Sequence, residues 1–308
     1  MANLKQRFLL VSDMHYTVGE APEVFNKTHP GSVACAASGN AFGLTQREKI
    51  EKVYTDIMAE NERAPLDAVL VLGDLSVDDY DFRNLPVNYC IKFKEDCLDR
   101  LPCPSYTLAG NHDSYPSSMW EEFFGYGREY AIEIDGSVFI MLDTFKAIPA
   151  TTASGAAHTP VDYEFLKNAL DEYKGKKIFL CSHYFETRTT GNSTFTDEVR
   201  QLIKDNEDIV FMYRGHTHVN SVTNMGEEYG EKTIIDIGGY GYQGMKIDNR
   251  YEFNIFDFKW AWGYQILEIY DDFIKTYHVK TKMHYEGVNG SFDVDETVSG
   301  ETTKTLKS

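Results

Sequence analysis

Five short motifs in this sequence place metal-binding side chains at the ends of apolar runs. In chain order they are an Asp-x-His pair, a Gly-Asp pair, a Gly-Asn-His-Asp sequence, a single histidine and a Gly-His-x-His sequence. Their seven potential donors are Asp13, His15, Asp74, Asn111, His183, His216 and His218. Carboxylate and amide oxygens combined with imidazole nitrogens suit Mn²⁺, Fe²⁺ or Zn²⁺. Because seven donors exceed what one tetrahedral ion needs, the sequence predicts two divalent ions that share a bridging carboxylate.

Each motif taken alone also has an ordinary structural explanation. An Asp-x-His pair can be a polar loop, a Gly-Asp pair is a common turn, and a single buried histidine is more often a hydrogen-bonded core residue than a ligand. His216 and His218 are more informative, because residues two apart on an extended segment point the same way. The glycines before Asp74, Asn111 and His216 indicate tight turns that bring backbone and side chain close to the metals. The ordered set therefore favours a metal centre.

The apolar runs that stop at these motifs have the length and composition of buried strands. They comprise residues 7–11, 68–72, 106–109, 178–181 and 209–213. Helices are predicted between them, one starting at a capping box of Thr45 and Glu48 and another at Thr159 and Pro160. Strands that alternate with helices predict an α/β protein, in which ligands bind beyond the carboxyl ends of the strands.

The sequence after about residue 233 is rich in β-forming residues, and Asp271-Asp272 is the predicted turn of a hairpin. The last part of the chain is rich in Ser, Thr, Gly and charge without periodicity, which is typical of a flexible tail. We therefore predict a single catalytic domain over residues 1–287 and a polar, flexible tail over residues 288–308. Residues 16–44 form a long segment without a clear period, and segments of this length are typically functional or disordered.

The five motifs, in this order, resemble the signature blocks of the calcineurin-like metallophosphoesterases over about residues 8–219. The resemblance implies the family fold, which has four layers, with two mixed β-sheets in a sandwich flanked by helices. It also implies a division of the ligands between two ions that Asp74 bridges. The first ion would be bound by Asp13, His15, Asp74 and His218. The second ion would be bound by Asp74, Asn111, His183 and His216.

The resemblance implies a reaction as well. Two such ions can hold a bridging hydroxide and lower its pKa towards neutrality, which provides a nucleophile for the hydrolysis of a phosphoric ester. His112 matches the family's histidine that is not a ligand, and it is the predicted general acid for the leaving oxygen. Asp113 is predicted to orient His112 or to tune its charge.

Differences from family branches narrow the expected substrate. Purple acid phosphatases have Gly at the position of His15 and Tyr at that of Val77, and the family's protein phosphatases have Glu at that of Asp113. The pattern looks closest to the class III cyclic-nucleotide phosphodiesterases. We therefore predict a dinuclear phosphoesterase that hydrolyses a small-molecule phosphodiester. A phosphomonoesterase with the same site is the alternative, followed by a non-catalytic metal-binding scaffold.

The amino-acid composition limits which partners the protein is expected to bind. The formal charge of −18 repels a phosphate backbone at long range, which argues against a nucleic-acid partner. Apolar runs are too short for a membrane span or a signal peptide, so we expect a cytoplasmic protein without membrane contact. Five cysteines without a C-x-x-C pair argue against a disulfide framework. A small phosphorylated substrate is the expected partner.

Several residues outside the five motifs are candidates for contact with a cofactor or substrate. Residues 239–244 fit the G-x-G-x-x-G fingerprint, but no helix is predicted after them, so dinucleotide binding is rejected. The tyrosines of this segment are candidates to face the substrate. His29 and His158 lie in loops that could reach the site.

Overall fold

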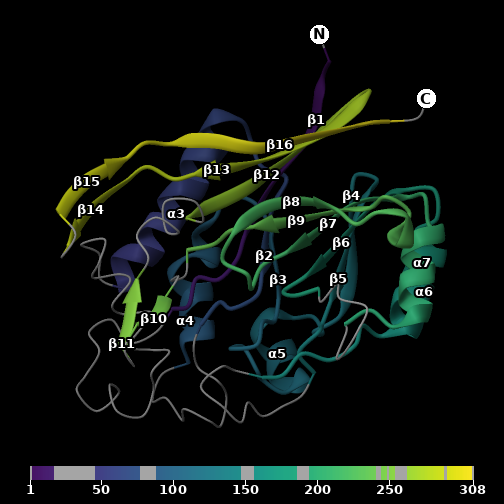
Figure 1. Ribbon diagram of the computed structural model, residues 1–308, viewed down its shortest axis with the longest axis horizontal. Coiled ribbons are helices and arrows are strands. Elements are labelled where there is room, and N and C mark those ends of the chain that lie inside the picture. Colours follow the sequence, from purple (N-terminus) through teal and green to yellow (C-terminus); the bar gives the residue numbers. More distant parts are fainter. Residues whose placement is uncertain are drawn as a thin grey trace.

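The computed structural model describes residues 2–16, 46–76, 88–146, 156–185, 194–240, 244–247, 250–253, 262–287 and 290–306. Two six-stranded mixed sheets pack against each other, and helices cover their outer faces (Figure 1). This is the four-layer α/β sandwich that the family resemblance implies. No helix in the described part of the chain is long and apolar enough to cross a membrane.

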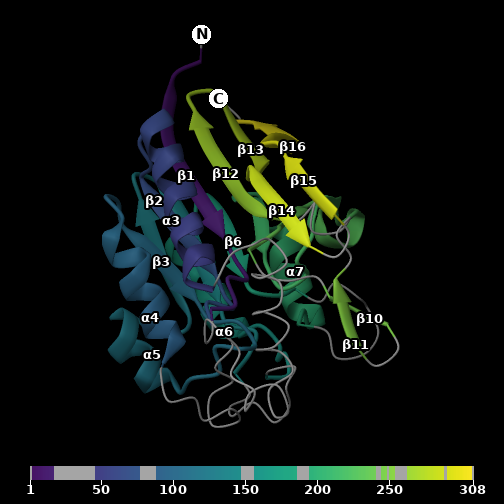
Figure 2. The same cartoon turned by 90° about the vertical axis from the view of Figure 1, so that its left-hand side faces the viewer.

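The first sheet has the strand order β16-β13-β12-β1-β2-β3. Its strands are β1 (Leu4–Val11), β2 (Ala68–Leu72), β3 (Ser105–Leu108), β12 (Gly263–Tyr270), β13 (Phe273–Lys280) and β16 (Thr297–Thr305). Strands β1, β2 and β3 are parallel, and β12 runs antiparallel to β1. The helices on its outer face are α3 (Gln46–Arg63), α4 (Tyr89–Asp96), the 3₁₀ turn η1 (Leu98–Arg100) and α5 (Ser117–Phe124). Figure 2 shows α3, α4 and α5 along this side of the molecule.

The second sheet has the strand order β4-β5-β6-β7-β9-β8. Its strands are β4 (Tyr130–Ile134), β5 (Ser137–Leu142), β6 (Lys177–Ser182), β7 (Ile209–Arg214), β8 (Asn220–Asn224) and β9 (Thr233–Ile237). The four inner strands are parallel, and the edge strands β4 and β8 are antiparallel to their neighbours. Helices α6 (Tyr163–Glu172) and α7 (Asp197–Asp205) cover it, with a 3₁₀ turn, η2 (Glu227–Tyr229). Two hairpins complete the chain, β10 (Gly244–Ile247) with β11 (Arg250–Phe253) and β14 (Met283–Gly287) with β15 (Gly290–Val294).

The alternation of side chains along the strands produces three apolar layers. In β1, Phe8 and Leu10 lie between the two sheets, whereas Leu9 and Val11 belong to the cluster under α3. A third cluster packs β5, β6 and β7 against α6 and α7. Because both faces of the central strands are covered, these strands are apolar throughout. Each fully buried side chain of this size contributes about 1.5–3 kcal/mol of hydrophobic stabilisation.

The helix predicted at Thr159 and Pro160 begins later than expected. Helix α6 starts at Tyr163, and Asp162 is its N-cap, accepting a hydrogen bond from the Phe165 N–H at 3.0 Å. The first-turn donors need a side-chain acceptor, and Asp162 supplies it three residues after Thr159. Helix α3 is confirmed, although Thr45 of its predicted capping box lies outside the described residues.

The flexible tail predicted after residue 287 differs from the structure. Strand β16 pairs antiparallel with β13 from Thr305 opposite Phe273 to Thr297 opposite Lys280. It is an edge strand that exposes most of its polar side chains, so backbone pairing orders it without an apolar face. A composition-based prediction cannot detect such a strand, and β15 within the same segment is also paired.

Candidate metal centre

The five motifs converge at one edge of the sandwich. Asp13 and His15 follow β1, Asp74 follows β2, Asn111 follows β3, His183 follows β6, and His216 and His218 follow β7. These strands run parallel within their sheets, so their carboxyl ends lie at a common edge. The structure brings all seven predicted donors together in two adjoining clusters.

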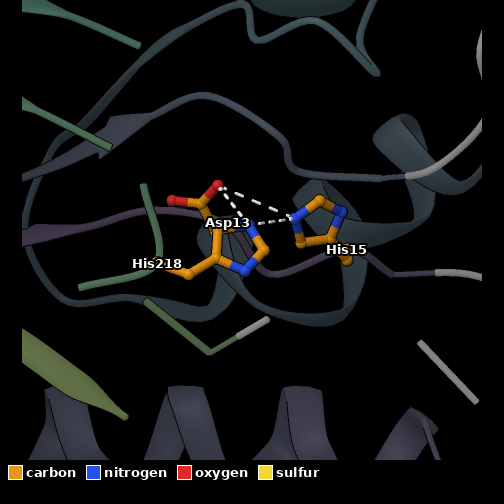
Figure 3. A group of neighbouring side chains, drawn as sticks. All are labelled: Asp13, His15 and His218. Carbon is orange, nitrogen blue, oxygen red and sulfur yellow. Dashed lines mark hydrogen bonds and ion pairs between the residues drawn. The ribbon is translucent and has the colours of Figure 1, made fainter. Parts of the chain in front are cut away.

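The first cluster contains Asp13, His15 and His218 (Figure 3). Asp13 Oδ1 lies 3.1 Å from His218 Nε2 and 3.7 Å from His15 Nε2. The two imidazole Nε2 atoms are 3.0 Å apart. One carboxylate oxygen and two ring nitrogens thus point at a common volume, as the ligands of one cation would.

The second cluster contains Asp74, Asn111, His183 and His216. Asn111 Oδ1 lies 3.1 Å from His183 Nε2 and 2.9 Å from His216 Nδ1. Asp74 Oδ2 is 3.2 Å from His183 Nε2 and also 3.7 Å from His15 Nε2 of the first cluster. A single oxygen of Asp74 therefore lies between the two clusters.

Asp13 provides a test of whether these residues fit a metal. Its Oδ1 is fully buried and accepts no hydrogen bond from the described residues. A buried carboxylate oxygen that accepts no hydrogen bond is costly, and coordination of a cation removes that cost. Burial opposes ionisation, but His218, His15 and His183 hold the pKa of the Asp13 carboxyl well below its usual range. The residues present therefore fit a divalent ion.

The charges in the site attract positive charge. Burial lowers the pKa of His15 to about 4. Burial also lowers the pKa of His216, and with the added effect of the charge on His183 it falls to about 3. Both rings are therefore neutral near pH 7 and can bind metal through a lone pair. Burial also opposes the charged form of His183, yet Asp74 and Asp13 raise its pKa to about 9. The two carboxylates thus attract positive charge to this position, and a metal ion would be attracted by the same field.

Backbone strain is concentrated in the same residues. Seven non-glycine residues in the described ranges have positive φ, and five of them are predicted ligands. These five are Asp13 (56°), His15 (47°), Asp74 (51°), His216 (65°) and His218 (54°). A left-handed conformation costs about 1–2 kcal/mol for such residues. It persists where the surroundings fix the conformation, which is typical of a functional site.

The glycines of the motifs allow close approach, as the sequence indicates. A Cβ at Gly73 would lie 2.6 Å from His183 Nδ1, and one at Gly110 would lie 2.8 Å from Asp74 Cγ and nearer still to Oδ1. A Cβ at Gly215 would lie 2.9 Å from Asp13 Oδ2 and would meet Ser12. These positions have no room for a side chain because the ligands themselves occupy the space.

Contacts outside the two clusters orient the ligands. His183 Nδ1 lies 2.7 Å from the Leu72 carbonyl oxygen. Nδ1 donates in this contact, which leaves Nε2 free to coordinate. The Thr217 hydroxyl, between His216 and His218, donates to Asp236 Oδ1 at 2.8 Å. Backbone N–H groups hold the carboxylates, with that of His216 donating to Asp13 Oδ2 at 3.0 Å.

His112 and Asp113 have different surroundings. His112 is buried beside the first cluster, with its ring 5.3 Å from that of His15. The backbone N–H of His112 donates to Asp74 Oδ1 at 2.9 Å. Asp113 accepts hydrogen bonds from the N–H groups of Leu75 (3.0 Å), Ser76 (3.1 Å) and Gly110 (3.1 Å). Burial, and then the charge of Asp74, raise the pKa of Asp113 to about 6. The observed contacts of Asp113 therefore hold the backbone around Asp74.

Several residues at the site were missed by sequence reasoning. The Phe145 ring lies 5.5 Å from that of His183 and 5.7 Å from that of His216, and the Tyr184 ring lies 4.7 Å from that of His216. Asp143 follows the apolar run of β5, so the rule that site residues follow buried strands would have found it.

The hairpin that contains β5 turns at Asp135 and Gly136, which both have positive φ and form the Asp-Gly hairpin signal.

Of the loop residues expected near the site, His158 lies close to it and Tyr240 does not face it. His158 lies close to it, because its ring is 5.6 Å from that of Tyr184. Tyr240 is fully buried and donates to Asp56 Oδ2 at 2.8 Å, so the expectation that it faces the substrate is wrong. Tyr242, Val77 and His29 lie outside the described residues, as do residues 17–44 of the long loop.

Fold and site together place the protein among the metal-dependent hydrolases. Residues 6–220 match the family model of the calcineurin-like phosphoesterases, and the chain belongs to this family. It is accordingly a metal-dependent phosphoric ester hydrolase.

Solved structures share the fold at low sequence identity. A dimetal phosphatase from Danio rerio has a TM-score of 0.59 and 11% identity, over 96% of this chain and 99% of that chain. The structure of PhoD has a TM-score of 0.55 and 10% identity, over 100% of this chain and 72% of that chain. No curated protein sequence matches the chain.

Proposed function

We propose that the protein hydrolyses a small-molecule phosphodiester with two divalent ions, either Mn²⁺, Fe²⁺ or Zn²⁺. The observation that carries the proposal is the position of Asp74 Oδ2, 3.7 Å from His15 Nε2 of one cluster and 3.2 Å from His183 Nε2 of the other. Asp74 would be the shared ligand. Asp13, His15 and His218 would complete one site, and Asn111, His183 and His216 the other.

Two divalent ions at these positions would activate a water molecule and offset the charge of the phosphoryl group. The protein's own part is to hold the ligands and to supply a proton. His112 would donate a proton from an imidazole nitrogen to the leaving oxygen, and its backbone is fixed by the hydrogen bond to Asp74 Oδ1. Asp113 would keep Asp74 in place through the backbone of Leu75 and Gly110.

In the described part of the chain, the pairing of two arginines near the site supports a monoanionic diester over a dianionic monoester. Two arginines approach the strand ends of the second sheet, and each is neutralised by its own carboxylate. Arg128 Nε lies 2.6 Å from Asp143 Oδ2, and Arg214 Nε lies 2.6 Å from Asp236 Oδ1. A terminal phosphate dianion is best held by additional unpaired cations, which these two side chains do not provide. The formal charge of −18 disfavours a long nucleic acid.

The substrate preference is tested after reconstitution with Mn²⁺. We expect kcat/KM for bis-p-nitrophenyl phosphate to exceed that for p-nitrophenyl phosphate by about 10-fold or more, equivalent to about 1.4 kcal/mol of transition-state stabilisation. The opposite preference would identify a phosphomonoesterase. Hydrolysis of neither ester, with two Mn²⁺ bound, would identify a scaffold.

The role of His112 is tested with His112→Ala. A general acid contributes about 10²–10⁴-fold, so the variant is expected to lose most of its activity on the preferred ester. Its Mn²⁺ stoichiometry should equal that of the parent, because His112 is not among the proposed ligands. A variant as fast as the parent would show that His112 is not the acid.

A further inference from the structure

Arg128 is a buried arginine whose hydrogen-bonding capacity is fully used. It lies between α5 and β4, with 4% of its surface exposed. A guanidinium has five N–H donors, and here all five are engaged. Nε and Nη2 donate to Asp143 Oδ2 (2.6 Å) and Oδ1 (3.2 Å), and Nη2 also donates to the Phe145 carbonyl (3.1 Å). Nη1 donates to the carbonyls of Tyr115 (2.7 Å) and Asp113 (3.2 Å).

These acceptors belong to two segments that are distant in sequence. Asp113 and Tyr115 follow His112, in the loop after β3 of the first sheet. Asp143 and Phe145 follow β5 of the second sheet. One planar, rigid group therefore joins the two sheets at the edge where the metal centre lies.

Each segment carries a group that touches the reaction centre. On one side is His112 itself, directly before Asp113. On the other side is the Phe145 ring, which packs 5.5 Å from His183 and 5.7 Å from His216. Asp143 Oδ1 also accepts from the Phe145 N–H at 2.8 Å, so the same ion pair fixes the backbone of that aromatic residue. The distance between His112 and these two histidines is thus set partly by Arg128.

A purely stabilising role is the alternative explanation, and Arg7 provides a matched comparison. Arg7 is also 4% exposed, is paired with the buried Glu60, and donates to the carbonyls of Glu60 and Ala64. It lies in β1 on the order of 20 Å before Asp13 along the strand. Buried ion pairs are weak evidence for stability in themselves, so the location of Arg128 is the feature that distinguishes the two.

We propose that Arg128, held by Asp143, is a positioning residue that sets the place of His112 relative to His183 and His216. This inference rests on the proposed role of His112 as general acid. Loss of Arg128 should therefore affect the protonation of the leaving group more than it affects metal binding. Displacement of a catalytic group by about 1 Å can lower the rate about 100-fold.

The test compares two diesters whose leaving groups differ in their need for a proton. Bis-p-nitrophenyl phosphate releases a stable phenolate, and diphenyl phosphate releases a poorer leaving group. In Arg128→Lys and in the isosteric Asp143→Asn, we expect kcat on diphenyl phosphate to fall about 10-fold further than kcat on the nitrophenyl ester. Calorimetric Mn²⁺ affinity should stay within about 3-fold of the parent value, a change of less than about 1 kcal/mol. Arg7→Lys should lower the melting temperature and leave the ratio of the two rates unchanged.

His112→Ala, measured on both diesters, separates failure of the inference from failure of the proposed function. If His112→Ala shows the differential loss and the Arg128 and Asp143 variants lose both activities equally, Arg128 does not position the acid. If His112→Ala shows no differential loss, the acid role is wrong and the inference falls with it. Failure of both variants to fold would overturn the inference too, because the pair would then serve stability alone.

Discussion

Gly110 lies at the end of β3, directly before Asn111, and it has no space for a side chain. A methyl group at this position would lie 2.8 Å from Asp74 Cγ, whereas ordinary contact begins at 3.4 Å. The methyl group would be closer still to Oδ1 and to the Asp74 backbone nitrogen, so the whole of Asp74 must move by on the order of 1 Å. Because Asp74 Oδ2 lies between the two clusters, such a shift would disturb both proposed metal sites at once.

For Gly110→Ala we therefore expect kcat/KM to fall by about 100-fold, or about 2.7 kcal/mol in transition-state stabilisation. Mn²⁺ binding, measured by calorimetry, should weaken in the same variant. The assay is hydrolysis of the preferred p-nitrophenyl ester at saturating Mn²⁺ and at limiting Mn²⁺. These two conditions separate weaker metal binding from misplacement of metal that is bound.

Gly127→Ala is the matched control. The nearest atom to a Cβ at Gly127 is the Glu129 carbonyl oxygen at 3.6 Å, an ordinary contact. This variant should therefore have the activity and Mn²⁺ affinity of the parent. If Gly110→Ala also kept both, Asp74 would not be as closely confined as the structure indicates, and the bridging argument would be refuted.

Three further predictions concern metal affinity and stability. Thr217→Val removes the hydrogen bond to Asp236 between two proposed ligands, so Mn²⁺ affinity should fall about 10-fold and Thr217→Ser should restore it. His278 is fully buried in β13, and burial lowers the pKa of its imidazole from 6.5 to about 4. The unfolded chain therefore binds more protons than the folded chain between these values, and stability should fall as the pH falls through this window. Between about pH 7 and about pH 4.5, the free energy of unfolding measured by urea denaturation should fall by about 2 kcal/mol because of this group. His278→Leu should lack this contribution, and an equal loss in the variant would exclude His278 as its source. Chelation of metal should lower the melting temperature of the protein. Mn²⁺ at about 100 times its Kd should raise the melting temperature, because binding at that concentration adds about 2.7 kcal/mol to the free energy of unfolding. An unchanged melting temperature would argue against binding to the folded state.

The sequence by itself determined which residues are candidate donors and where they stand along the strands. Apolar runs that stop at Asp13, Asp74 and His183 are local signals, because a strand buried on both faces must be apolar along its length. The chemistry of the donors is also local, since a carboxylate offers a hard oxygen and an imidazole a nitrogen lone pair whatever the fold around them. Candidate metal ligands could therefore be named before their distances were known.

The tertiary structure decided the contacts made between segments that are distant in sequence. The buried ion pair of Arg128 and Asp143 and the order of the polar strand β16 depend on packing that no short pattern records. So does the burial of Tyr240, which is directed away from the expected substrate by its hydrogen bond to Asp56. The physical reason is the same in each case. The free energy of a polar group depends on the partner that folding brings to it, and that partner comes from another part of the chain.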